Sequence, residues 1–228
     1  MKIIFTILLA GVGMAHAGNI TGTVNAVGKP ALEPAAAGGN YDSRKYKFVE
    51  KVNYDELHDF VVYIEGPVGA KPAPPEKPLA VDTRRIEQKG AAFLPHVLPL
   101  VVGTTVEWPN YDSIYHNVFS VSEAKTFDLD LYKGNPPEKK ITFDKTGRVD
   151  VFCSIHANMN CVILVLENPY FAVTDARGHY VITNVPPGTY KLKAWHERMP
   201  AQTQKIVVPD SGDLKQDFTL GITGLPRY

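Results

Sequence analysis

Residues 153–159 are Cys-Ser-Ile-His-Ala-Asn-Met, and they bring a thiol, an imidazole and a thioether into one short loop. A further histidine, His116, stands on a separate upstream segment. Two histidines, one cysteine and a weak axial methionine are the ligand set of a blue-copper electron-transfer centre. The sequence therefore predicts one copper ion bound by His116, Cys153, His156 and Met159.

The segments around this loop have the composition of β-strands joined by turns. Residues 103–110 (GTTVEWPN) predict a turn, a strand and a break, and they are followed by residues 115–119 (YHNVF), which carry His116. Residues 142–153 (TFDKTGRVDVFC) predict a strand, a turn and a second strand that runs directly into the ligand loop.

These segments together resemble the cupredoxin family, which includes plastocyanin, amicyanin and azurin, and the Cys-x2-His-x2-Met loop is most similar to the short loop of amicyanin. The resemblance covers residues 86–167 and implies a Greek-key β-sandwich that binds one type I copper ion through His116, Cys153, His156 and Met159. It also implies that Asn117, directly after the first ligand, holds the ligand loop by hydrogen bonding.

The two cysteines leave an alternative open. Cys153 and Cys161 are the only cysteines in the chain, and in an oxidising compartment such a pair is commonly a disulfide. A disulfide would remove the thiolate and abolish the copper site. If Cys153 binds copper instead, Cys161 is an unpaired thiol at the start of the apolar run 162–166.

The amino terminus predicts export. Residues 1–17 have a positive start, a short apolar run and the small-residue ending Ala-His-Ala, which are typical of a cleaved signal peptide. We expect a periplasmic protein without a membrane span, because no later segment has the apolar length that a spanning helix needs. Lys and Arg number 24, as do Asp and Glu, so nothing predicts a nucleic-acid partner or a polybasic membrane anchor.

A second pattern follows the copper motif. Residues 175–180 (DARGHY) and 185–190 (VPPGTY) resemble the Asp-x-x-Gly-x-Tyr and Val-Pro-Pro-Gly-x-Tyr rhythm of the carboxypeptidase regulatory-like, or transthyretin-like, β-sandwich. The resemblance implies a small accessory sandwich over residues 168–228 and indicates a fold without an activity.

The segment before the copper motif, residues 18–85, predicts two confident strands at residues 20–24 and 60–64 and a Pro-rich loop at 68–78. Two strands cannot bury a core alone, so we expect them to extend the copper-binding sandwich. The predicted fold is all-β throughout, because long amphipathic helical patterns are scarce.

The leading functional prediction is a periplasmic electron carrier that exchanges single electrons with a redox donor and acceptor protein. No Ser/His/Asp order or paired carboxylates predict a hydrolase, so we do not expect an enzyme. Two alternatives stay open: a copper-trafficking protein, and a metal-free secreted interaction module with a Cys153–Cys161 disulfide. His96 has no ligand-like partner at short spacing and is interpreted as a loop histidine.

Overall fold

The computed structural model describes residues 17–28, 57–68, 83–136 and 138–221. These residues form strands and connecting turns, so the all-β prediction is confirmed. They contain no helix long and apolar enough to cross a membrane. The predicted signal peptide and most of the predicted Pro-rich loop lie outside the described residues.

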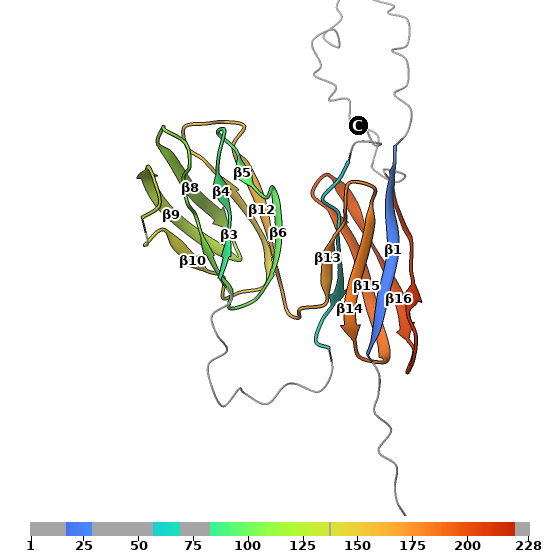
Figure 1. Cartoon of the computed structure of the whole chain (residues 1–228). Helices are drawn as coiled ribbons and strands as arrows, with labels where there is room; N and C mark the ends of the chain where they lie inside the picture. The colour runs from blue at the N-terminus through green and yellow to red at the C-terminus, as the bar shows by residue number, and fades with distance from the viewer. Residues whose placement is uncertain (1–16, 29–56, 69–82, 137, 222–228) are drawn as a thin grey trace, which may run out of the picture.

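Two β-sandwiches stand side by side (Figure 1). The first is built from residues 83–166 and contains a five-stranded sheet in the order β6-β12-β11-β8-β9, a three-stranded sheet in the order β10-β7-β3 and a small β4-β5 hairpin. Its strands are β3 (Thr83–Arg85), β4 (Glu87–Gln88), β5 (Phe93–Leu94), β6 (Val97–Val101), β7 (Thr105–Glu107), β8 (His116–Ser122), β9 (Lys125–Tyr132), β10 (Lys140–Thr142), β11 (Gly147–Phe152) and β12 (Asn160–Leu166).

The core of the first sandwich lies between these sheets and is dominated by aromatic and β-branched side chains. Trp108 is fully buried and packs edge-on against Phe93, with ring centroids 5.9 Å apart. Phe143 is also fully buried and meets Phe127 edge-on. Cys153 and Met159 belong to this same core, so the ligand loop is anchored on a packed interior.

The second sandwich combines the two ends of the described chain. One sheet joins β1 to β14 and β17, with β18 also paired to β1, and the other has the order β13-β2-β15-β16. Its strands are β1 (Gly18–Val27), β2 (Val61–Glu65), β13 (Phe171–Val173), β14 (His179–Val185), β15 (Gly188–His196), β16 (Met199–Val208), β17 (Leu214–Lys215) and β18 (Phe218–Gly221).

The expectation that the amino-terminal strands extend the copper-binding sandwich is therefore wrong. β1 lies in the second sandwich, where Ile20 is paired with Ile182 and Val24 with Phe218. β2 is hydrogen-bonded on its two sides to β13 and β15. The carboxyl-terminal strands need β1 and β2, because β1 lies between β14 and β17 in one sheet and β2 lies between β13 and β15 in the other.

The Asp-x-x-Gly turn of the second sandwich has a clear physical basis. Asp175 Oδ1 accepts hydrogen bonds from Arg177 N at 2.8 Å and His179 N at 2.9 Å. Gly178 has a φ of +81°, and a Cβ there would lie 2.3 Å from the Val24 carbonyl oxygen. Glycine is therefore required both for the left-handed backbone and for the close approach of β1.

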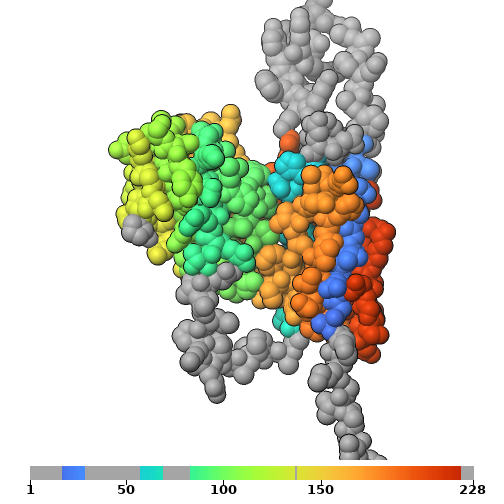
Figure 2. Space-filling view, viewed as in Figure 1, coloured from blue at the N-terminus to red at the C-terminus, as the bar shows by residue number. Residues whose placement is uncertain are grey.

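β12 is buried on both faces, which explains its uninterrupted apolar sequence. Cys161, Ile163 and Val165 face the core of the first sandwich. Val162 and Leu164 alternate with them and face the second sandwich, which covers this outer side of the sheet. The space-filling view shows the two sandwiches in contact with each other (Figure 2).

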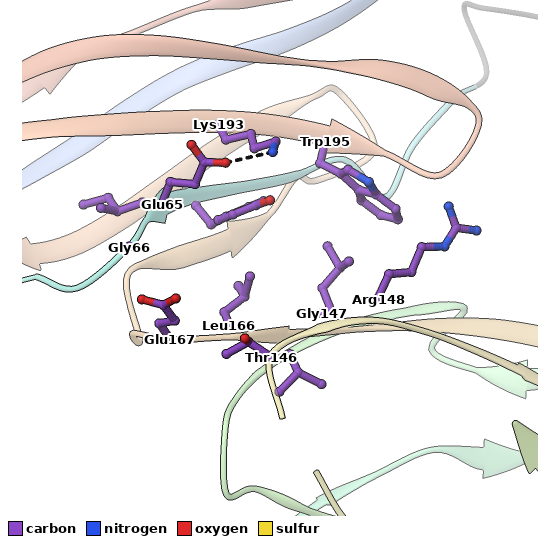
Figure 3. Close-up of a pocket in the computed structure, with 13 residues that line it drawn as sticks. Glu65, Gly66, Thr146, Gly147, Arg148, Leu166, Glu167, Lys193 and Trp195 are labelled. Carbon is purple, nitrogen blue, oxygen red and sulfur yellow. Dashed lines mark hydrogen bonds and ion pairs between the residues drawn. The ribbon is translucent and has the colours of Figure 1, made fainter. Parts of the chain in front are cut away.

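An open slot of about 290 Å³ lies at one edge of this contact (Figure 3). Trp195 lines it from the second sandwich, and the Arg148 guanidinium of β11 lies 5.7 Å from its ring centroid. Lys193 and Glu65 form an ion pair at 2.8 Å within the second sandwich. Three charged groups at this edge, Glu65, Lys193 and Arg148, thus have partners already.

Candidate metal centre

Three of the predicted ligands meet at one end of the first sandwich. The donor atoms of His116, Cys153 and His156 all lie within 4.8 Å of one another. His116 Nδ1 is 3.1 Å from His156 Nδ1, and Cys153 Sγ is 3.5 Å from the same His156 atom. Among the described residues, this is the one cluster of histidine, cysteine or carboxylate donors with spacing suited to a metal ion.

His116 is the first residue of β8, and its side chain is fully buried. Its Nε2 atom lies 2.8 Å from Asp112 Oδ2, so Nδ1 is the nitrogen that faces Cys153 and His156. A carboxylate on the distal nitrogen is the usual way to orient a metal-binding imidazole. Sequence analysis missed Asp112, although its position four residues before His116 is a local signal.

Asp112 is itself held by the backbone of the neighbouring turn. Its two carboxylate oxygens accept hydrogen bonds from Gly90 N at 2.7 Å and Ala91 N at 2.9 Å. The pKa of Asp112 is lowered, first by the hydrogen bond from the Ala91 amide, with further contributions from Gly90 and His116. The carboxylate is therefore ionised when it orients His116.

The ligand loop is closed by its own backbone. Cys153 N donates a hydrogen bond to Met159 O at 3.1 Å, and Met159 N donates to His156 O at 3.0 Å. Met159 is only 1% exposed and packs in the same core cluster as Cys153. The two ends of the loop are thus held together where β11 ends and β12 begins.

Asn117 links this loop to β8. Its Oδ1 accepts a hydrogen bond from Ser154 N at 3.3 Å, and its own N–H points at Cys153 Sγ at 3.5 Å. Its Nδ2 donates to Asp128 Oδ1 on β9 at 2.6 Å, which fixes the amide orientation. An N–H directed at a cysteine sulfur stabilises negative charge on that sulfur.

Cys153 and Cys161 are both free and buried, so the disulfide alternative is not what the structure contains. Cys161 is the cross-strand partner of Val151 and faces the core. Burial raises the pKa of the Cys161 thiol well above its usual range. It remains a small apolar core residue, as expected for a cysteine outside the metal cluster.

The donor chemistry of this site fits copper. One thiol and two imidazoles suit a soft or borderline transition metal, whereas a magnesium or calcium site would need oxygen donors. Two of the donors are buried and His156 is partly exposed. Copper bound here would be held by His116, Cys153 and His156, with Met159 as the candidate fourth ligand.

The other histidines that the structure describes are not part of this cluster. His196 is buried, packs at a tilt against Phe60 with ring centroids 5.0 Å apart, and is the cross-strand partner of Met199 in the β15–β16 hairpin. The pKa of His196 is lowered, mainly by burial. His179 is paired with Asp175 on the surface.

The carboxyl-terminal part of the chain matches one family model. Residues 160–221 match the carboxypeptidase regulatory-like domain. The match covers β13 to β18, where the sequence resembles this family, and it also includes β12 of the first sandwich. No curated protein matches the chain.

Several solved copper proteins are similar to part of the chain. A purple cupredoxin from Nitrosopumilus maritimus is 26% identical over 36% of this chain and 98% of its own, with a TM-score of 0.31. A reduced variant of amicyanin is 22% identical over 38% of this chain and 85% of its own, with a TM-score of 0.33. A copper-containing nitrite reductase from Thermus scotoductus is 30% identical over 45% of this chain, which spans 26% of the reductase, with a TM-score of 0.35.

Proposed function

We propose that the protein is a type I copper protein that transfers single electrons between redox partner proteins. The observation that carries this proposal is the cluster of His116, Cys153 and His156 donors within 4.8 Å of one another. Bound copper would supply a one-electron couple. In this proposal, Cys153, His116 and His156 would hold the copper, and Met159 would be a weak fourth ligand that tunes the reduction potential.

The surroundings of the cluster favour electron transfer because they limit rearrangement. His116 is held by Asp112, the loop is closed between Cys153 and Met159, and Asn117 bonds the loop to β8. Donors held by such contacts keep their positions when the charge of a bound metal changes. A site of this kind exchanges electrons with little reorganisation.

His156 is the proposed route for electrons, because it is the partly exposed member of the cluster. Ile155, directly before it, is 51% exposed. Ile114 and Tyr115, which precede the other histidine ligand, are 47% and 58% exposed. Exposed apolar side chains beside both histidines suit brief docking of a redox partner, since such patches mark protein contact sites.

The proposal includes export to the periplasm after removal of residues 1–17, and a role as electron carrier without an enzymatic reaction of its own. The visible absorption spectrum of the protein, titrated with Cu(II), tests the function. We expect an intense blue or purple band at one copper per chain, and its loss in Cys153→Ala. Copper binding without that band would instead favour a trafficking role, and a chain that binds no copper would refute both.

A further inference from the structure

The contact between the two sandwiches has an apolar centre with a polar contact at one end. Val97 of β6 and Val162 of β12 are buried against Val61 of β2. At the end of this cluster, His96 Nε2 lies 2.8 Å from Glu197 Oε1, which belongs to the β15–β16 turn of the second sandwich. This turn therefore reaches across to the segment directly before β6.

His96 is also bonded to the first residues of β12. Its Nδ1 atom lies 3.2 Å from Asn160 O, and its carbonyl oxygen accepts a hydrogen bond from Val162 N at 2.8 Å. His96 thus contacts β12 through both its side chain and its backbone. Asn160 directly follows Met159, the last residue of the ligand loop.

A continuous set of contacts consequently runs from the second sandwich to the metal centre. Glu197 orients the His96 ring, His96 binds the Asn160 carbonyl, and the next residue back is Met159, whose carbonyl accepts the hydrogen bond from Cys153 N. Both ring nitrogens of His96 face oxygen acceptors, so the ring has no freedom to flip without losing a contact. The side chains of this pair are only partly exposed, at 36% for His96 and 21% for Glu197.

We propose that Glu197 of the second sandwich is a positioning residue for the ligand loop, and that it acts through His96 on the start of β12. This inference concerns the purpose of the accessory sandwich and rests in part on the proposed copper function. The second sandwich then does more than cover an apolar face of the first. It also holds the start of β12, the strand that directly follows Met159 of the ligand loop. Support of this kind sets both metal affinity and reduction potential.

The first test uses copper-free protein, so that it does not depend on the metal. Amide hydrogen exchange is measured in the full chain for the wild type, Glu197→Ala and Glu197→Gln. Hydrogen bonds that involve charged groups change a local opening equilibrium by about tenfold or more. We expect the Val162 amide, which donates to His96, to exchange about tenfold faster in Glu197→Ala, and less so in Glu197→Gln because the amide oxygen still accepts from His96.

Glu65→Ala is the matched control. It removes an equal charge at the slot on the other edge of the sandwich contact, where Glu65 pairs with Lys193 and does not touch His96. We expect it to leave Val162 exchange unchanged. If Glu197→Ala and Glu197→Gln accelerated Val162 exchange equally, the charge of Glu197 alone would be responsible. If Glu65→Ala accelerated it as much as Glu197→Ala, any weakening of the contact between the sandwiches would be enough. Either result would overturn the proposal.

The second test uses the copper-loaded protein. We expect Glu197→Ala to lower copper affinity by about tenfold and to shift the reduction potential, with partial recovery in Glu197→Gln and no change in Glu65→Ala. Failure of the wild type to form the charge-transfer band would refute the copper function while leaving the exchange result standing. A normal band with no response to Glu197→Ala in either test would refute the positioning role alone.

Discussion

His116 Nδ1 and His156 Nδ1 lie 3.1 Å apart although forty residues separate them in the sequence. Cys153 Sγ lies 3.5 Å from the same His156 nitrogen, so two imidazoles and one sulfur form a donor set suited to one metal ion. The first histidine begins β8 and the second belongs to the loop after β11, and these strands are neighbours in one sheet. Sheet pairing therefore brings these donor atoms together.

The two buried cysteines should respond differently to substitution. Cys153→Ala removes a donor of the cluster, so we expect loss of the visible band and of tight copper binding. Cys161→Ala should retain the band and cost about 1–2 kcal/mol of unfolding free energy, because a small apolar group leaves a packed core. Absorption titration and urea unfolding measure the two effects. A band that survives in Cys153→Ala would contradict the assignment.

Met159→Leu should leave copper bound and raise the reduction potential, because a weak axial donor that favours the oxidised ion is replaced by an apolar group. Spectroelectrochemical titration measures the change. Met199→Leu is the natural control, since Met199 is also buried but lies in the second sandwich. Complete loss of copper binding in Met159→Leu would contradict the proposed axial role.

Asp112→Ala should lower copper affinity by about tenfold, because it removes the carboxylate that orients His116. Competition with a copper chelator measures the affinity. Asp144→Ala serves as control, as Asp144 is a surface carboxylate paired with Lys125. If both variants bound copper alike, the orientation of His116 would not depend on Asp112.

Acid should destabilise the second sandwich through Asp175 and Asp217. The pKa of Asp175 is lowered first by the backbone hydrogen bond from His179, and that of Asp217 by the one from Thr23. A lowered folded-state pKa stabilises the fold above the unfolded value of about 4, and this stabilisation is lost as the pH falls through the folded value. Thermal unfolding of the wild type and of Asp175→Asn/Asp217→Asn between pH 6 and pH 2.5 tests this.

The double variant should be less stable than the wild type at pH 6 and should show a smaller loss on acidification. Salt screens charge pairs between exposed side chains. If the backbone hydrogen bonds of Asp175 and Asp217 are the source of the stabilisation, added salt should reduce the difference between the wild type and the double variant only slightly. An unchanged pH dependence in the double variant would show that other groups control acid stability.

Gly22→Ala should destabilise the second sandwich selectively. A Cβ at Gly22 would lie 1.8 Å from Gln216 O, which is backbone and cannot turn away. We expect a loss of about 1–3 kcal/mol in unfolding free energy, because β1 must shift from β17. The copper band should persist, since Gly22 is remote from the first core. Gly103 has open space around it but a φ of +94°, so Gly103→Ala tests backbone strain in the first sandwich without a steric clash.

Local chemistry made much of the metal centre predictable. Cys153, His156 and Met159 lie within seven residues, and their donor types alone restrict the metal. Most strands could also be predicted, because Val- and Thr-rich runs between turn residues indicate a strand whatever strand pairs with it. The ligand loop, the all-β class and the Asp-x-x-Gly turn were thus determined by the sequence itself.

Only the tertiary structure decided which strands associate. β1 lies more than 150 residues from β14 in the sequence, and alternating side chains predict a buried face without identifying the sheet that buries it. The same limit hid the contact between His96 and Glu197, which are 101 residues apart. Hydrogen bonds across strands and domains depend on the packed fold, so no local pattern of residues encodes them.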